Sequence, residues 1–360
     1  MSDATAGPGE LPAITEFTPA ELAEKLADWQ LPDYRFRQTL AYLRDPGAAS
    51  FDEITVLPKA LRARFAAMFR PSSLTLRSQA LDPEGHTDNF LFESIHGGLI
   101  EAVGIHAPDR LTVCVSSQIG CAMRCAFCAT GRGGLERNLR SAEIFEQVQW
   151  IGRTLRKRVT NIVFMGMGEP LHNLDNVLAA LNYIRDPQGL SMGARKVTVS
   201  TVGVVPAMLK LAETAPRVYL AVSLHAPDDV TRSRLVPVND AYPIAQVMQA
   251  VRAHHQRTQL PTLFEYVLLR GVNDAPAQAA LLVELVRHAP CKVNLIPWNP
   301  VAGLPFERPT MQEQRTFLAV LRRARIPATI RMSKGRPVDA ACGQLRRRAQ
   351  DGSELVKFKV

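Results

Sequence analysis

The sequence predicts an α/β fold, a partial (β/α)6 barrel preceded by a small helical unit and a short β extension. From about residue 108 onward, apolar runs of strand length alternate with amphipathic stretches of helical length. Such alternation is typical of a parallel sheet whose strands are connected by helices. Six or more such units favour an open or partial barrel with the helices outside. We expect five segments: a flexible arm (1–11), a helical accessory domain that binds RNA (12–73), the β extension (74–107), the barrel core (108–345) and a basic tail (346–360).

The N-terminal third carries two kinds of pattern. Residues 1–11 are mainly small residues, glycine and proline, whereas "TPAELAEKLADW" and "YRFRQTLAYLRD" show the apolar spacing of helices. A helical unit ending near Arg70 follows from this spacing. Residues 74–107 then alternate apolar and polar side chains around Asp-Pro-Glu-Gly and Gly-Gly turns. This alternation predicts short antiparallel strands that lead into the barrel.

Seven apolar runs supply the expected barrel strands. Amphipathic stretches such as 141–157 and 275–288 separate them. In folds of this kind the reactive groups gather where the carboxyl ends of the strands meet. The runs are "LTVCVSS", "NIVFMGM", "KVTVSTV", "VYLAVSL", "LFEYVLL", "KVNLIPW" and "PATIRMS".

Composition limits the function classes. The 360 residues are 46% hydrophobic, enough for a full-sized core, and 43 Lys and Arg outnumber 34 Asp and Glu. The excess favours a polyanionic partner such as nucleic acid, although an unspecialised basic surface explains it equally well. The first residues lack a signal-peptide pattern and no stretch reaches the length of a membrane span, so we expect a cytoplasmic protein without membrane contact. The bunched cysteines are unlike a secreted disulfide framework.

Four of the six cysteines lie in "CVSSQIGCAMRCAFCATGRGG", residues 114–134, whose part 121–134 we call the cysteine loop. Cys121, Cys125 and Cys128 have the spacing C-x3-C-x2-C. Structural zinc requires four ligands, and no downstream C-x2-C or H-x3-H pair supplies the fourth. An iron–sulfur cluster held by three thiolates leaves one iron open to a substrate or cofactor. The loop therefore predicts an open iron–sulfur cluster, with zinc as the alternative.

Small polar residues follow the ends of the predicted strands. In "GMGEP" (166–170) the glycines allow the backbone to approach a ligand, and Glu169 can accept a hydrogen bond from an ammonium group. Taken singly, such residues are more often turns, caps or core residues; together at one edge they form a plausible cofactor site. The others are Ser200, Ser223, His225 and Asn299.

The remaining candidates are three cysteines and one acid. Cys342 lies in a basic segment, 322–348, with nine Lys or Arg against one acid. Neighbouring cations lower the pKa of a thiol, so Cys342 is either a nucleophile or an ordinary unreactive thiol. Cys114 and Cys291 read as core residues. Glu101, within an apolar run, is either a desolvated general base or a strand residue that faces solvent.

The cysteine spacing, with Phe127 before the last cysteine, resembles the signature of the radical S-adenosylmethionine (radical SAM) superfamily. From Leu31 onward the cysteine loop, "FMGMGEP", "VSLHAP", "EYVLLRGVND", "NLIPWNP" and "DAACGQL" together resemble the RlmN family of adenine carbon-2 methyltransferases. The resemblance implies a radical SAM barrel in which Cys121, Cys125 and Cys128 bind a 4Fe-4S cluster. SAM would bind at the open iron, with Phe127 near its adenine, and an electron would cleave it to a 5′-deoxyadenosyl radical.

The resemblance also implies catalytic roles. The first SAM methylates the thiolate of Cys342, and a radical from the second abstracts hydrogen from that methyl group, whose carbon then adds to the adenine ring. Glu101 would be the proton acceptor, and Cys114 the thiol that resolves the protein–RNA adduct through a transient disulfide with Cys342. The positions that match SAM contacts are Gly168, Glu169, Ser200, Ser223, Leu224, His225 and Asn299.

The implied partners are RNAs and an electron donor. The family modifies an adenosine of 23S rRNA at the peptidyl transferase centre and the adenosine 3′ of the anticodon in some tRNAs, and the target base must leave its stack. A flavodoxin- or ferredoxin-type donor and a monomeric enzyme are expected.

Two alternatives stay open. A sister group methylates carbon 8 of the same rRNA adenine with the same cluster and the same "AACGQL" cysteine. The motifs "GMGEP" and "IPWNP" look more like the carbon-2 enzymes. A non-enzymatic zinc and RNA-binding module is the second alternative.

Overall fold

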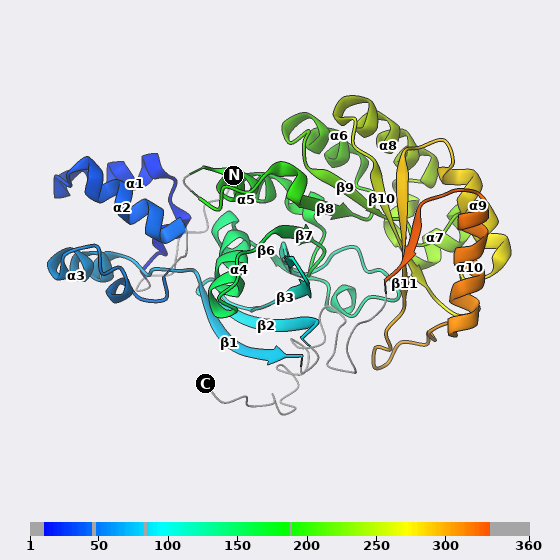
Figure 1. Ribbon diagram of the computed structural model, residues 1–360, viewed down its shortest axis with the longest axis horizontal. Coiled ribbons are helices and arrows are strands. Elements are labelled where there is room, and N and C mark those ends of the chain that lie inside the picture. Colours follow the sequence, from blue (N-terminus) through cyan, green and yellow to red (C-terminus); the bar gives the residue numbers. More distant parts are fainter. Residues whose placement is uncertain (1–10, 45–47, 83–84, 188, 332–360) are drawn as a thin grey trace.

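The computed structural model describes residues 11–44, 48–82, 85–187 and 189–331. Within these residues the main sheet is 10-stranded, in the order β1-β2-β3-β4-β7-β8-β9-β10-β11-β12. A separate two-stranded sheet pairs β5 with β6. Figure 1 shows the long sheet curving across the molecule with helices on its outer side. The predicted α/β fold class is confirmed.

Seven strands of the main sheet, β4 and β7 to β12, pair in parallel with one another in that order. Each contains part of one of the seven apolar runs, so the prediction of these strands is correct. Their parallel direction brings all their carboxyl ends to one edge, which we call the barrel mouth. The strands are β4 Arg110–Cys114, β7 Asn161–Phe164, β8 Val197–Thr201, β9 Tyr219–Ser223, β10 Thr262–Leu268, β11 Cys291–Pro297 and β12 Ala328–Ile330.

Helices connect successive parallel strands and cover the outside of the sheet (Figure 1). Local signals explain where some of them begin: at α10, Thr310 and Glu313 form a capping box. The apolar face of α10 packs inward, with the rings of Phe317 and Tyr266 5.3 Å apart. The helices are α4 Ser141–Thr154, α5 Leu174–Arg185, α6 Val205–Thr214, α7 Asp229–Leu235, α8 Ile244–Thr258, α9 Pro276–Val286 and α10 Met311–Arg323.

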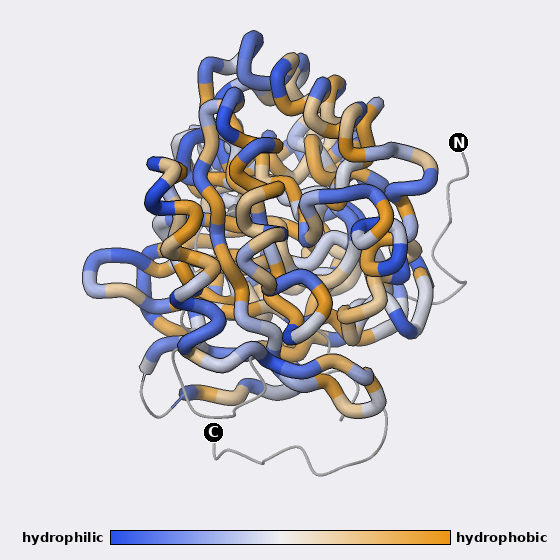
Figure 2. Tube along the Cα trace, turned by 90° about the vertical axis from the view of Figure 1, so that its right-hand side faces the viewer, coloured by the Kyte–Doolittle hydropathy of each residue, from blue (hydrophilic) through white to orange (hydrophobic). Residues whose placement is uncertain are grey.

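The hydrophobic residues are concentrated between the sheet and these helices, and Figure 2 shows orange segments inside and blue ones at many outer turns. Burial of this apolar surface is the main stabilising contribution to the fold. No helix in the described part of the chain is both long and apolar enough to cross a bilayer.

The β extension is continuous with the barrel sheet. Strands β1 Leu74–Leu81, β2 Thr87–Ser94 and β3 Leu99–Ala107 are antiparallel, as predicted, and β3 pairs with β4. The pairing of Val103 with Cys114 fixes the register of this junction. The extension therefore adds three strands to the first edge of the parallel sheet.

The first described residues form a helical unit with a separate core. That core contains Phe51, Phe65 and Phe69, with the Phe51 and Phe65 rings stacked 5.7 Å apart. The unit lies beyond α4 and α5 at one end of the molecule (Figure 1). Its elements are η1 Ile14–Glu16, α1 Pro19–Lys25, η2 Ala27–Trp29, α2 Asp33–Arg44, η3 Phe51–Glu53 and α3 Lys59–Met68.

Candidate functional site

A small hairpin closes the base of the cysteine loop. Strands β5 Gln118–Gly120 and β6 Leu135–Asn138 pair antiparallel on either side of it. Gly120 has a φ of +75°, and a Cβ there would lie 2.0 Å from the carbonyl oxygen of Gly134. The Cys121 N–H donates to that same oxygen at 2.7 Å. The sequence did not predict the hairpin, because its strands are only three and four residues long and lack regular alternation.

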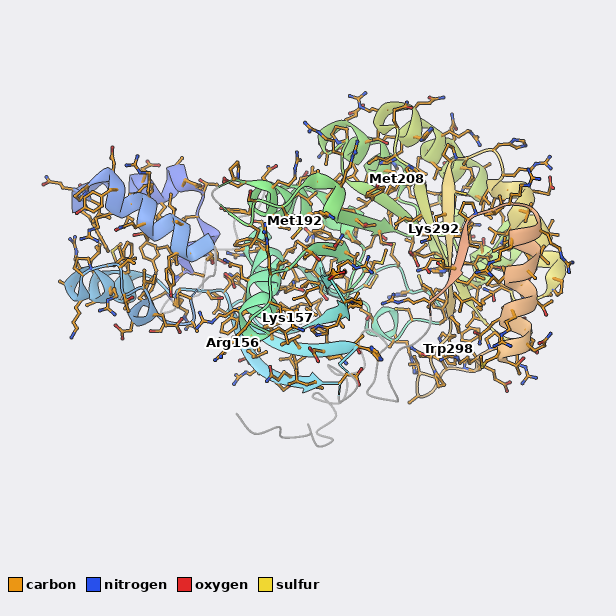
Figure 3. All side chains as sticks on the ribbon, in the orientation of Figure 1. Arg156, Lys157, Met192, Met208, Lys292 and Trp298 are labelled. Atoms are coloured by element: carbon orange, nitrogen blue, oxygen red, sulfur yellow. The ribbon has the colours of Figure 1, made fainter. Side chains whose placement is uncertain are left out.

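The cysteine loop is also attached to the opposite side of the barrel mouth. The Ala126 N–H donates to the carbonyl of Leu235 at 2.9 Å. Trp298, labelled in Figure 3 directly after β11, donates its indole N–H to the Phe127 carbonyl at 3.1 Å. Cys125 belongs to one apolar cluster with Leu235 and Trp298. The loop thus begins after β5, contacts the segments that follow β9 and β11, and returns through β6.

The three cysteine thiols lie near one another in a mostly apolar environment. Cys121 and Cys125 are each 9% exposed, and Cys128 is half-buried. Burial raises the pKa of Cys121 to about 12 and that of Cys125 well above its usual value, and repulsion from the charged form of Cys128 adds to both shifts. Binding to a cationic metal centre would therefore be required to hold them as thiolates at neutral pH.

Among the described residues, no three His, Cys, Asp or Glu side chains are grouped so that they could hold one metal ion as they stand. Structural zinc requires four ligands, of which the cysteine loop supplies three cysteines.

Glu169 is buried beside the cysteine loop, in the segment that follows β7. Its carboxylate accepts from the N–H groups of Leu171 (3.0 Å) and Val202 (2.9 Å). Burial raises its pKa to about 7, although these hydrogen bonds lower it. Its charge also raises the pKa values of Cys121 and Cys125, so the three groups are neighbours. Glu169 thus lies beside the cysteine loop, and its expected contact with an ammonium group stays a prediction.

The glycines of "GMGEP" approach protein, not empty space. A Cβ on Gly166 would lie 2.7 Å from the Val115 carbonyl oxygen, and one on Gly168, where φ is +100°, 2.5 Å from the Gln118 Cβ. Gln118 also accepts from the Glu169 N–H at 2.8 Å. The close approach that these glycines allow is, among the described residues, to the β4–β5 connection and the start of β5. Their expected approach to a ligand stays a prediction.

Ser200, next to last in β8, and Ser223, the last residue of β9, face each other on neighbouring strands. Their Oγ atoms are 3.4 Å apart. Two residues beyond Ser223, His225 has a φ of +60°, and its Nδ1 accepts from the Val267 N–H at 3.0 Å. Burial lowers the His225 pKa to about 3, so the ring is neutral at physiological pH and Nε2 carries the hydrogen. The edge-to-face contact of Phe127 with His225, 4.8 Å between centroids, joins the cysteine loop to this segment.

Leu224 and Asn299 complete the predicted set at the barrel mouth. Leu224 is buried, and its N–H donates to the Glu265 carbonyl at 3.0 Å. Asn299 follows Trp298 and accepts from Arg308 at 2.9 Å. Leu224 thus lies just after β9 and Asn299 just after β11, both at the barrel mouth.

Glu101 and Cys114 lie on adjacent strands. Glu101 on β3 is 6% exposed, so the interpretation as a solvent-facing strand residue was wrong. Cys114 ends β4 at 7% exposure and pairs with Val103, two residues from Glu101. The Ser116 hydroxyl donates to the Glu101 carbonyl at 2.5 Å. These contacts bring the two residues to the same end of the sheet junction.

The other two cysteines differ in how far the structure describes them. Cys291 opens β11, is half-buried, and burial raises its pKa to about 11, as expected of an unreactive thiol. Cys342 and the basic tail 346–360 lie outside the described residues. Their predicted roles therefore stay predictions.

Known proteins similar to this chain contain the same kind of fold and cysteine motif region. Residues 115–283 match the family model of the radical SAM superfamily. The crystal structure of a radical SAM methyltransferase from Sphaerobacter thermophilus is similar with a TM-score of 0.88 at 44% identity, over 92% of this chain and 98% of that one. A Chloroflexus aurantiacus protein named "Probable dual-specificity RNA methyltransferase RlmN" is 45% identical over 347 residues, 92% of each chain. The chain belongs to the RlmN family.

RlmN proteins of other bacteria are similar in sequence to this chain over nearly its whole length. The protein of the same name from Akkermansia muciniphila is 42% identical over 352 residues, 94% of this chain and 97% of its own. The predicted radical SAM methyltransferase class is thereby confirmed, and the non-enzymatic alternative is set aside. Radical SAM membership implies SAM and a 4Fe-4S cluster, and the three neighbouring thiols of the cysteine loop, two of them buried, fit that cluster.

Proposed function

We propose that this enzyme methylates carbon 2 of an adenosine in 23S rRNA, at the peptidyl transferase centre, and of the adenosine 3′ of the anticodon in tRNA. The observation that carries the proposal is the 45% identity to a dual-specificity RNA methyltransferase over 92% of both chains. The net charge of +9 suits a polyanionic substrate. Adenine carbon 2 is electron-poor, so a radical route suits it better than polar attack on SAM.

Cys121, Cys125 and Cys128 would bind the cluster, which supplies the electron that splits SAM homolytically. The SAM contacts would be Gly168, Glu169, Ser200, Ser223, Leu224, His225 and Asn299. Glu169 has a buried carboxylate suited to the ammonium group of SAM, and the neutral Phe127–His225 pair offers an aromatic surface to its adenine. A flavodoxin- or ferredoxin-type protein would donate the electron in a cytoplasmic setting.

The chain's own residues would carry the remaining steps. The Cys342 thiolate takes a methyl group from one SAM. That methyl carbon would lose a hydrogen atom to the radical formed from a second SAM and would then bond to adenine carbon 2. Glu101 removes the hydrogen of carbon 2 as a proton, and the unpaired electron left on the adduct passes to a one-electron acceptor, which leaves a closed-shell thioether between Cys342 and the base. Cys114 then attacks the sulfur of Cys342; the sulfur–carbon bond breaks, the carbon takes up a proton, and the two cysteines remain as a disulfide for a reductant to reopen. The burial of Glu101 and Cys114 on adjacent strands supports this assignment.

Anaerobic reconstitution followed by mass spectrometry of the RNA tests the proposal. We expect 4Fe-4S absorbance and 2-methyladenosine in both an rRNA fragment and tRNA, distinguished from an 8-methyladenosine standard. The variant C342A should abolish methylation, C114A should leave protein covalently attached to RNA, and the matched control C291A should behave as wild type. Bound zinc without iron and sulfide, 8-methyladenosine as the product, or full activity in C342A would each contradict it.

A further inference from the structure

Arg232 of α7 is a fully buried cation at the barrel mouth. It is 0% exposed, and its Nε donates to the Leu224 carbonyl at 3.0 Å. Its two terminal nitrogens donate to the Asn239 Oδ1 at 2.7 Å and to the Val202 carbonyl. These acceptors are neutral. Burying a guanidinium group without a hydrogen-bonded carboxylate costs free energy, so an anion elsewhere in its surroundings is to be expected.

The cysteine loop lies against α7 and becomes an anionic centre once its thiolates bind the cluster. Arg232 lies one helical turn before Leu235, whose carbonyl accepts from the N–H of Ala126, the residue after Cys125. Cys125 and Leu235 also share one apolar cluster. Burial lowers the Arg232 pKa to about 10, whereas the charged forms of Cys125 and Asp229 raise it. Arg232 is therefore a cation at pH 7 and lies within electrostatic reach of a cluster ligand.

The competing anion, Asp229, lies at the exposed start of α7. Its Oδ1 accepts from the Asn239 side-chain amide at 3.0 Å and from the Ile244 N–H at 2.9 Å. Because Asp229 is exposed, solvent screens its charge more than that of a buried group. The charge of Arg232 is thus incompletely compensated on the side of the cysteine loop.

We propose that Arg232 is a positioning residue that favours the reduced state of the cluster bound by the cysteine loop, while its hydrogen bonds fix the segments that follow β8 and β9. This inference rests on the proposed cluster. One electron from an external reductant makes the cluster with its three thiolates more negative. A buried cation nearby stabilises that added charge, and net charge and surroundings set cluster potentials.

Redox titration of the reconstituted full-length protein at pH 7, with dithionite as reductant and electron paramagnetic resonance as readout, tests the proposal without SAM or RNA. The variant R232Q should shift the midpoint potential of the cluster to more negative values. The variant R232K keeps the positive charge but lacks the guanidinium group with its several N–H donors, and its midpoint potential should stay near that of wild type. Arg234 is exposed on the same helix, so R234Q is a matched control with no expected shift. An unchanged potential in R232Q, or equal shifts in R232Q and R232K, would overturn the proposal.

A second variant, D229N, tests the same inference in case R232Q does not fold. D229N keeps an acceptor oxygen for Ile244 but removes the negative charge that partly compensates Arg232. It should shift the potential slightly to less negative values, because solvent screens the Asp229 charge only in part, and a shift to more negative values would refute the inference. If wild type assembles no cluster, the proposed function fails; if it does and the potentials stay fixed, only the role of Arg232 fails.

Discussion

At the scale of single residues, burial distinguished interpretations that the sequence left open. Glu101 could have faced solvent in an alternating strand, but it is buried beside the β4 strand. For Gly166 and Gly168 the sequence indicated that the backbone packs closely against another group, but it did not identify that group. The neighbours, Val115 and Gln118, are about 50 positions away in the chain. Arg232 gave no sequence signal, since one arginine in an amphipathic helix usually faces solvent.

Glu169 provides the test at this scale. The variant E169Q keeps the shape of the side chain but removes its charge and replaces one of the two oxygens that accept from Leu171 and Val202 with an amide nitrogen. If the carboxylate binds the ammonium group of SAM, a charged hydrogen bond worth about 1.5–3 kcal/mol is lost, and SAM should bind roughly 10- to 100-fold more weakly. Equilibrium binding of SAM to the reconstituted protein measures this.

The control for that measurement is E284Q, because Glu284 is exposed on α9. It should bind SAM as wild type does. Equal affinity of E169Q and wild type would contradict the assigned contact.

At the scale of elements, the sequence predicted the strands and helices well but not the connections that shape the site. Long apolar runs and amphipathic stretches have periodicities that single segments reveal. The β5–β6 hairpin has no such period; it forms because Gly120 adopts a positive φ next to Gly134 and because Leu235 and Trp298 hold the loop from the opposite side. Those contacts link segments over 100 residues apart, which no local pattern encodes.

The hairpin leads to a prediction about cluster assembly. G120A would force a positive φ on alanine and bring its Cβ to 2.0 Å from the Gly134 oxygen, at a cost of at least about 1–3 kcal/mol. The displaced hairpin should misplace Cys121, so iron and sulfide bound per chain after reconstitution should fall well below wild type. The control is G133A, in the same loop, where an added Cβ meets no atom within 4 Å. Equal iron content in G120A and G133A would contradict the role assigned to the hairpin.

At the scale of the whole molecule, the helical unit is docked on the barrel by a buried carboxylate that the sequence could not reveal. Glu146 of α4 accepts from the N–H groups of Ser73 (2.9 Å) and Leu74 (2.8 Å) and from the hydroxyls of Thr15 and Ser72. Thr15 belongs to the helical unit and Leu74 begins β1, so one side chain joins three parts of the chain. The partners lie more than 70 positions away, beyond any periodicity of α4.

This contact predicts a pH dependence of stability. Burial raises the pKa of Glu146 from 4.5 to about 7, so the folded state binds its proton more tightly than the unfolded state does. For a carboxyl group whose folded pKa is raised, the folded state is favoured below pH 4.5, and that advantage is lost as the pH rises through 7. The shift corresponds to roughly 3 kcal/mol.

The free energy of unfolding of wild type, relative to E146Q, should therefore fall by about that amount between pH 4.5 and 7.5, because glutamine does not titrate. Denaturant unfolding across this range measures the difference, and E284Q, at an exposed glutamate, should show the wild-type profile. Parallel pH profiles for wild type and E146Q would mean that Glu146 ionises freely in the folded protein, and the burial of its carboxylate at this junction would then carry no energetic penalty.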